Sequence, residues 1–153
     1  MTANMTARED QEQATLFRWA QLQAGMHPEL QLLMHIPNGG KRNAAEAARF
    51  KAEGVKAGVP DLLLPVARQG KHGLWIELKR RQGGRLSENQ SEWLEALSSQ
   101  GYRTEVCCGW EEASRVLLNY LTAEQAESTG STVPARKKAK GKGFDFEEWL
   151  DNL

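Results

Sequence analysis

The sequence contains only two cysteines and no long apolar run. No segment approaches the roughly 20 consecutive apolar residues that a membrane-spanning helix needs, and the polar N-terminus MTANMTAREDQEQ does not resemble a secretion signal. Cys107 and Cys108 are adjacent, and neighbouring side chains of a strand point to opposite faces, so no disulfide between them is expected. These absences argue against a membrane protein or a disulfide-stabilised secreted protein, and they predict a cytoplasmic location.

The chain also has no net charge, with 20 Lys and Arg against 20 Asp and Glu. Total charge therefore gives no indication of binding to nucleic acid. The basic residues are nevertheless clustered, as contacts with a phosphate backbone require, although each cluster taken alone also fits a solvated loop. The clusters are Lys41 and Arg42, then Lys79, Arg80, Arg81 and Arg85, and finally Arg136, Lys137, Lys138, Lys140 and Lys142.

Two strand-like segments, residues 59–66 and 74–78, flank a polar turn. Because side chains alternate along a strand, Glu77 and Lys79 share one face of the second segment, while its aliphatic residues Leu74, Ile76 and Leu78 face the core. If the strands pair, Asp61 comes close to that charged face. Two carboxylates and a lysine are a minimal set for holding a divalent metal ion and activating water for phosphodiester hydrolysis. The alternative is a hairpin with a solvated Glu77–Lys79 ion pair, because so short a pattern has many chance matches.

The remaining periodicity predicts a single α/β core. Helices are expected where apolar residues recur at helical spacing or alanine dominates, and strands where short apolar runs end at turn residues. The resulting order of elements predicts a mixed central sheet with helices on its faces. Helices are predicted over residues 6–24, 43–53, 87–101 and 110–121, and strands over 30–36, 59–66, 74–78 and 102–107.

Five sequence blocks resemble one nuclease family. In chain order they are EDQEQATLFRWA, HIPNGGKR, GVKAGVPDLLLPV, GLWIELKRRQGGRLSENQSEWL and GYRTEVCCGWEEA. Their order and wording are similar to small phage and bacterial members of the VRR-NUC (virus-type replication-repair nuclease) family, within the PD-(D/E)xK nuclease superfamily. The resemblance covers about residues 9–121 and implies the restriction-endonuclease-like core of that superfamily, a mixed central sheet flanked by helices.

The resemblance also implies roles for individual residues. It identifies Asp61 and Glu77 as ligands of Mg²⁺ or Mn²⁺, and Lys79 as the catalytic lysine. Gln90 is implied as an accessory residue of the site. Ser87-Glu88-Asn89-Gln90 also fits a helix capping box, in which Gln90 bonds back to the start of its helix, and that local role alone would explain a glutamine there.

The family carries a further acidic residue on its first helix. Both Glu9 and Glu12 lie in the matching segment, and Glu9 has the ExxxQ spacing to Gln13. Since residues three apart lie near the same helix face, spacing leaves both as candidate metal-assisting acids. For DNA contacts, the residues near the site or in the basic tail are the candidates. They are Asn38, Lys41, Arg42, Arg80, Arg81, Arg85, Lys137 and Lys138.

These observations predict a Mg²⁺- or Mn²⁺-dependent DNA endonuclease of DNA repair or recombination. A metal-activated water would attack phosphorus in line, and Lys79 would position that water or stabilise the developing charge. Small stand-alone members of the family look like Holliday-junction resolvases, so the resemblance implies branched DNA as the partner. It also implies a homodimer, since cutting two symmetric strands needs two sites related by a two-fold axis.

Other interpretations of the same residues remain open. The enzyme could act on flap or linear DNA instead. A second alternative is a DNA-binding module that kept the nuclease fold without catalysis, although intact Asp61, Glu77 and Lys79 argue against it. A small-molecule phosphohydrolase is a third, and the lack of a Gly-rich phosphate loop argues against it.

The composition changes after residue 122, the predicted end of the nuclease domain (residues 1–122). Residues 123–143 are small, polar and then basic, without apolar periodicity, which predicts a disordered linker. Residues 144–153, FDFEEWLDNL, combine acidic and aromatic side chains. Such a segment either docks back on its own domain or binds a groove of a protein partner as a short amphipathic helix.

Overall fold

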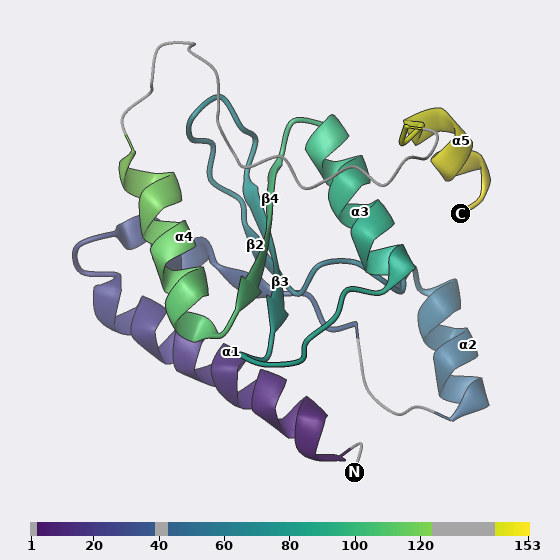
Figure 1. Ribbon diagram of the computed structural model, residues 1–153, viewed down its shortest axis with the longest axis horizontal. Coiled ribbons are helices and arrows are strands. Elements are labelled where there is room, and N and C mark those ends of the chain that lie inside the picture. The colour runs from purple at the N-terminus through teal and green to yellow at the C-terminus, as the bar shows by residue number, and fades with distance from the viewer. Residues whose placement is uncertain (1–2, 39–42, 124–142) are drawn as a thin grey trace.

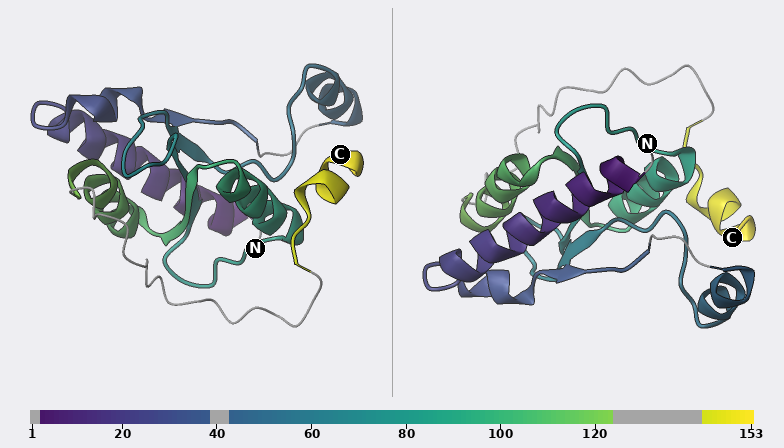
Figure 2. Two further views of the ribbon diagram at one scale, coloured as in Figure 1. Left: turned by 90° about the horizontal axis from the view of Figure 1, so that it is seen from above. Right: turned by 90° about the horizontal axis from the view of Figure 1, so that it is seen from below.

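The computed structural model describes residues 3–38, 43–123 and 143–153. Its helices are α1 (Ala3–Gln23), α2 (Ala44–Ala52), α3 (Glu88–Ser99), α4 (Trp110–Thr122) and α5 (Phe146–Asp151), and a short 3-10 helix, η1, spans Pro28–Leu32. Its strands are β1 (Met34–His35), β2 (Leu62–Leu64), β3 (Leu74–Lys79) and β4 (Arg103–Cys108). The strands form a central sheet, with α1 and α4 on one face and α3 on the other (Figure 1). The views from above and below show the same layers (Figure 2).

The sheet is mixed, with the strand order β1-β2-β3-β4. β2 pairs antiparallel with β1 and with β3, whereas β4 runs parallel to β3. A parallel pair needs a crossover connection, and α3 provides it across one face of the sheet. This arrangement confirms the predicted mixed α/β fold.

The apolar face of β3 lies at the centre of the core. Leu74, Ile76 and Leu78 are 0%, 1% and 2% exposed, and they belong to one buried cluster with Leu16 of α1 and Leu117 of α4. Full burial of such a side chain stabilises a protein by about 1.5–3 kcal/mol. The alternation predicted for this strand is therefore confirmed, and its other face is left for α3.

The strand predicted over residues 30–36 is wrong for most of its length. Residues Pro28–Leu32 form η1, and only Met34–His35 join the sheet. The buried residues Leu30 and Leu33 are three apart, which suits a 3-10 turn, whereas a strand would bury every second residue. Proline at the start of η1 also fixes φ at a helical value.

The strand predicted over residues 59–66 is present but short, since β2 spans only Leu62–Leu64. Pro60 and Pro65 flank it, and neither has an N–H to donate to a ladder. The helices α1 to α4 and the strands β3 and β4 all overlap their predicted ranges. Residues before β2, including Asp61, therefore belong to a loop, and other contacts must hold them.

Two predicted absences can be compared with the structure. Cys107 and Cys108 are both free, the first buried and the second exposed, as expected for adjacent residues of β4. Burial raises the pKa of the Cys107 thiol to about 12, so this thiol stays protonated. Among the described residues, no helix is long and apolar enough to cross a bilayer.

The C-terminal segment docks on the domain. Asp145 caps α5 by accepting from the Glu147 and Glu148 amides, and the Trp149 ring of α5 lies edge-on to the Trp93 ring of α3 with centroids 5.2 Å apart. Of the two alternatives for this segment, docking on its own domain is therefore the one present. The predicted linker falls almost entirely outside the described residues, and the domain boundaries stay a prediction.

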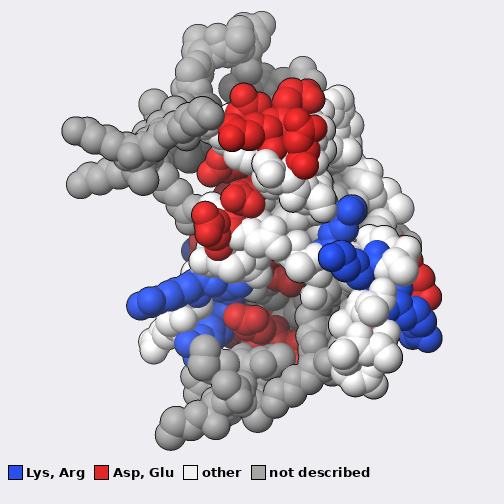
Figure 3. All heavy atoms as spheres, turned by 90° about the vertical axis from the view of Figure 1, so that its right-hand side faces the viewer, with Lys and Arg blue, Asp and Glu red and all other residues white. Residues whose placement is uncertain are grey.

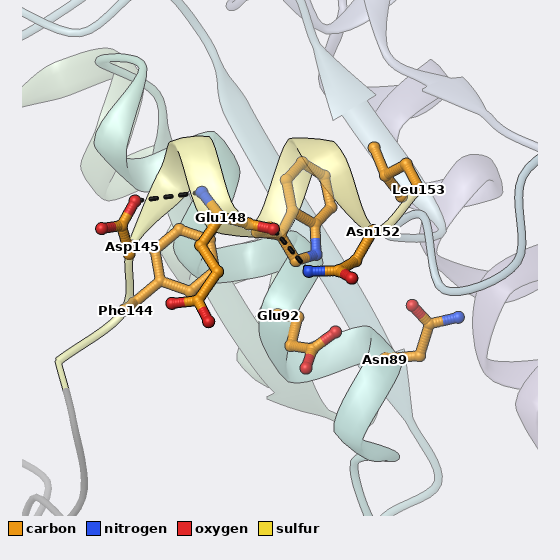
Figure 4. A pocket seen from close by; sticks show the side chains of 8 residues that line it. Asn89, Glu92, Phe144, Asp145, Glu148, Asn152 and Leu153 are labelled. Carbon is orange, nitrogen blue, oxygen red and sulfur yellow. Dashed lines mark hydrogen bonds between the residues drawn. The ribbon is translucent and has the colours of Figure 1, made fainter.

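A pocket lies between α5 and α3 (Figure 4). Asn89 and Glu92 of α3 line one side of it, and Phe144, Trp149 and Leu153 line the other. Neither α3 nor residues 143–153 contain a Lys or Arg, although both are rich in Asp and Glu. The two helices therefore carry charge of the same sign, and the ring contact between Trp93 and Trp149 joins them.

Gly58 marks a close approach between α3 and the loop that leads to Asp61. Its φ is +90°, and a Cβ at this position would lie 2.8 Å from Asn89 Cγ and 2.9 Å from Trp93 Cδ1. Gly54 has a similar φ of +94°, but a Cβ there would meet no atom within 4 Å. The two glycines thus share the same backbone requirement, and only Gly58 has a packing requirement as well.

This difference predicts unequal costs for two alanine substitutions. Gly54→Ala should lower the free energy of unfolding by about 1–3 kcal/mol, the cost of placing a non-glycine residue at positive φ. Gly58→Ala should cost a further 1–3 kcal/mol or so, because Asn89 and Trp93 must also move. Urea denaturation of the two variants measures the difference, and equal values would show that α3 is not tightly packed on this loop.

Candidate active site

Glu77 and Lys79 lie on the face of β3 that α3 covers, and both are buried. Glu77 is 2% exposed and Lys79 is 7% exposed, while Lys79 Nζ lies 3.0 Å from Glu77 Oε1. A Cβ on Gly84, in the loop after β3, would lie only 2.8 Å from Lys79 Cβ, so this loop packs tightly on the lysine. The pair is therefore a buried ion pair rather than a solvated one, and each charge needs the other because an unpaired buried charge is costly.

Gln90, in the first turn of α3, joins this pair. Its Nε2 donates to Glu77 Oε1 at 2.8 Å, and its Oε1 accepts from Lys79 Nζ at 3.1 Å. The same oxygen accepts from the Ser87 amide at 3.0 Å, while the Ser87 hydroxyl accepts from the Gln90 amide at 3.1 Å. The capping box and the contact with the charged pair are thus both present. We refer to Glu77, Lys79 and Gln90 as the buried polar cluster.

Asp61 lies beside this cluster, immediately before β2. Its Oδ2 accepts from the Leu78 amide of β3 at 2.9 Å. The antiparallel pairing of β2 with β3 places Leu62 opposite Ile76, which brings the start of one strand to the charged end of the other. The structure therefore brings together all four residues predicted from the PD…ExK and LSxxQ patterns: Asp61, Glu77, Lys79 and Gln90.

Both carboxyl groups have raised pKa values. Burial, and then the negative charge of Asp61, raise the pKa of Glu77 to about 7 against the lowering effect of Lys79. Burial also raises the pKa of Asp61, although the Leu78 amide and the charge of Lys79 oppose this shift. Two neighbouring carboxyl groups with raised pKa values are typical of a site that binds a cation.

One oxygen of Glu77 supports the same interpretation. Its Oε2 is buried, and among the described residues it has no hydrogen-bond partner. Mg²⁺ is commonly held by one or two carboxylates, with water and phosphate oxygens as its other ligands. In the described part of the chain, no group of three or more His, Cys, Asp and Glu side chains is arranged to hold a metal. The carboxylates of Asp61 and Glu77 therefore fit a divalent ion that takes its remaining ligands from solvent and substrate.

Glu12 makes contacts away from these carboxylates. Its Oε1 accepts from Arg81 Nε at 2.9 Å, and its Oε2 accepts from the Trp110 amide at the start of α4 at 2.8 Å. Arg81 also pairs with Glu111 of α4 at 2.9 Å. Glu12 thus ties α1 to α4 and to the loop after β3. Glu9 lies one turn earlier on α1 and is half-buried, and the metal-assisting role of either acid stays a prediction.

The residues predicted to contact DNA lie in different environments. Arg80 donates to the Gly83 carbonyl at 3.0 Å, Arg85 is exposed, and Asn38 donates to the Val59 carbonyl at 3.0 Å. Seen from the side of α3 and α5, acidic side chains gather at the top of the molecule where α5 lies, and basic side chains lie lower down on both flanks (Figure 3). Lys41, Arg42, Lys137 and Lys138 lie outside the described residues.

Sequence patterns missed two side chains that contact the loop before β2. His35 Nδ1 lies 2.9 Å from the Asp61 carbonyl oxygen, and Asn89 Nδ2 donates to the Ala57 carbonyl at 3.0 Å. These partners are 26 and 32 residues apart in the chain, so no local spacing predicts them. The HIPN segment, which lies in one of the five blocks, was the available signal for His35.

Comparison with known proteins agrees with this geometry. The family model of the VRR-NUC domain matches residues 7–111. A solved structure, described as a VRR_NUC domain protein, is 33% identical and has a TM-score of 0.64, and the match covers 74% of this chain and 88% of that one. The chain belongs to the VRR-NUC domain family. Among curated proteins, no match was found.

Membership of the VRR-NUC family confirms the resemblance seen in the sequence. It gives the protein a nuclease-type DNA-processing function, with DNA as its substrate. VRR-NUC domains typically need a divalent metal ion, which agrees with the unpartnered buried oxygen of Glu77. The four-stranded mixed sheet is likewise consistent with the PD-(D/E)xK-like fold of its structural neighbour.

The double role of Gln90 predicts a separation between activity and stability. Gln90→Glu keeps a capping-box residue but replaces the donor to Glu77 with a second negative charge, so DNA cleavage should fall about 10- to 100-fold. Ser87→Ala removes the cap and leaves Glu77 and Lys79 untouched, so it should cost about 1 kcal/mol of stability and leave cleavage near wild type. Cleavage rates and urea denaturation of both variants test this. Equal losses of activity would mean that Gln90 acts only through the helix start.

Proposed function

We propose that this chain is a metal-dependent DNA endonuclease in which Asp61 and Glu77 hold Mg²⁺ or Mn²⁺. The observation that carries the proposal is the buried, unpartnered Glu77 Oε2 beside the half-buried carboxylate of Asp61. Asp61 and Glu77 together have only Lys79 as an ion-pair partner in the described structure, which leaves negative charge that a divalent cation would offset. When bound, the ion would polarise the scissile phosphate and lower the pKa of a coordinated water.

Lys79 and Gln90 would position the attacking water and stabilise the developing charge. The ammonium of Lys79 has three N–H donors, and two of them are directed at Glu77 Oε1 and Gln90 Oε1. The third donor is left for the attacking water or for a phosphate oxygen on which charge develops. Gln90 keeps Lys79 and Glu77 in one geometry, so little reorganisation is needed when the substrate arrives.

We assign the assisting acid of α1 to Glu9 rather than to Glu12. Both oxygens of Glu12 already accept hydrogen bonds, from Arg81 and from the amide of Trp110. Glu9 has the ExxxQ spacing and lies on the same face one turn away. For contacts with the DNA backbone we propose the basic clusters named above and Asn38, with exposed Arg85 the best placed among the described residues.

Branched DNA is the proposed substrate, and the proposed active form is a homodimer. The substrate and the dimer are both supported by the family resemblance, because small stand-alone members of the family look like Holliday-junction resolvases. Two symmetric cuts need two copies of a site that contains one set of carboxylates, and a two-fold axis supplies them. A labelled four-way junction, a flap and a linear duplex, incubated side by side, would test this choice of substrate.

The metal-site assignment predicts which isosteric substitutions stop the reaction. Asp61→Asn and Glu77→Gln keep the size of the side chain but remove its charge, so each should lower cleavage of labelled DNA at least about 100-fold. Lys79→Met should do the same, because it removes the donor to water or phosphate. Cleavage should require Mg²⁺ or Mn²⁺ and stop in EDTA.

Circular dichroism and urea denaturation are the necessary controls for these variants. Removal of one member of a buried ion pair typically costs about 3–5 kcal/mol, so loss of activity counts only for variants that remain folded. Arg49→Met on α2 is the matched control for Lys79→Met. It makes the same kind of substitution in an ion pair, but the pair of Arg49 with Glu53 is exposed. A folded Lys79→Met protein that cuts at the wild-type rate would contradict the mechanism.

The tail gives a separate prediction about DNA affinity. Truncation after residue 129 removes the run of five basic residues between 136 and 142, so binding should weaken more at low salt than at high salt. The slope of log affinity against log salt should flatten by up to about 0.9 for each phosphate that the tail no longer neutralises. Metal-dependent cleavage should persist, because the buried polar cluster lies elsewhere.

Truncation after residue 143 is the matched variant for this experiment. It keeps the basic run but removes Asp145, Glu147, Glu148 and Asp151, so binding at low salt should become tighter. Fluorescence anisotropy with labelled duplex over a salt series measures both effects. An unchanged slope after truncation at residue 129 would show that the basic run does not contact DNA.

A further inference from the structure

The loop that carries Asp61 is held mainly by side chains. Residues 57–61 precede β2 and lie outside the strand ladder. The Ala57 carbonyl accepts from Asn89 Nδ2 of α3, and the Val59 carbonyl accepts from Asn38 Nδ2, both at 3.0 Å. The Asp61 carbonyl accepts from the Ile36 amide at 2.8 Å and lies 2.9 Å from His35 Nδ1.

The contact with His35 fixes the tautomer of its ring. A carbonyl oxygen is only an acceptor, so Nδ1 must carry the proton that it shares with Asp61. His35 pairs with Leu62 across β1 and β2, and its ring therefore reaches back by one residue to the preceding carbonyl. The side chain is exposed, and the bond does not bury it.

This bond is not needed to satisfy the backbone. The Asp61 carbonyl already accepts from the Ile36 amide, and one partner is enough to avoid the cost of an unsatisfied polar group. The second bond therefore adds little to stability, and its effect is to restrict where the residue can move. The carboxylate of the same residue accepts a hydrogen bond from the Leu78 amide of β3. Asp61 is therefore held by β1 through its main-chain carbonyl and by β3 through its side chain.

We propose that His35 is a positioning residue for Asp61, and that its Nδ1–H sets the place of the Asp61 carboxylate beside Glu77. His35 touches neither substrate nor metal in this scheme. It acts as the outer partners of metal ligands do, whose removal typically lowers metal affinity about 10- to 100-fold. The effect on metal binding rests on the proposed function, whereas the effect on Asp61 itself does not.

A set of three substitutions tests which ring nitrogen matters. His35→Asn keeps a donor near the position of Nδ1, His35→Gln keeps one near Nε2, and His35→Ala keeps neither. Mn²⁺ binding measured by calorimetry should weaken about 10-fold or more in the Ala and Gln variants. The Asn variant should bind close to the wild-type affinity. His72→Ala is the matched control, since His72 is also exposed and packs on Tyr102 before β3 begins.

A second measurement makes the inference independent of the metal. In metal-free protein, hydrogen exchange of the Leu78 amide reports on its bond with the Asp61 carboxylate. This exchange should be faster in His35→Ala and His35→Gln, and unchanged in His35→Asn and His72→Ala. Urea denaturation should place all four variants within about 1 kcal/mol of wild type, as for the loss of one exposed hydrogen bond.

The possible failures are distinguishable. If wild-type protein binds no Mn²⁺, or if Asp61→Asn binds it equally well, the proposed metal site fails, while Leu78 exchange still decides the role of His35. If Leu78 exchange is unchanged in His35→Ala, the positioning role is overturned whatever the metal does. If His35→Asn behaves like His35→Ala in both measurements, Nδ1 is not the atom that acts, and the proposal is wrong.

Discussion

The buried ion pair between Glu77 and Lys79 is the constraint on which the rest of this structure depends. Two charges beneath a helix are tolerated only when they are paired and hydrogen-bonded, and Gln90 supplies the extra bonds from the first turn of α3. Ser87 in turn fixes that turn through the capping box. The position of α3 on the sheet therefore depends on the charged pair of β3, because Gln90 both caps α3 and bonds to that pair.

Much of this site could be predicted from the sequence because it depends on local periodicity. Alternation along β3 separates the charged face from the leucine face, and the Ser-x-x-Gln spacing gives the helix cap. The place of Gln90 at the site is implied by the family resemblance, not by this spacing. Periodicity does not show that both faces are covered, since that depends on where distant helices pack. The error at residues 30–36 has a similar cause, because a short apolar run fits a strand or a 3-10 turn until its burial is known.

The contacts that sequence reasoning missed are those that join segments far apart in the chain. Glu12 accepts from the amide of Trp110, 98 residues away, and no spacing rule predicts that a helix end needs that acid. The contact of His35 with the Asp61 carbonyl depends on the pairing of His35 with Leu62 across β1 and β2, and these partners lie far apart in the chain. Proline on both sides of β2 explains why that loop needs side chains to hold it, but not which ones.

The docking of α5 on α3 has a consequence for how the protein responds to its ionic surroundings. Both helices are acidic and have no cation of their own, so their mutual repulsion weakens as salt screens it, while the Trp93–Trp149 contact is apolar and persists. Contacts with a nucleic-acid backbone respond in the opposite sense, because added salt removes the gain from counterion release. At low salt, therefore, α5 is held less tightly on α3 and binding of nucleic acid is favoured. At high salt, α5 is held more tightly and nucleic acid is released.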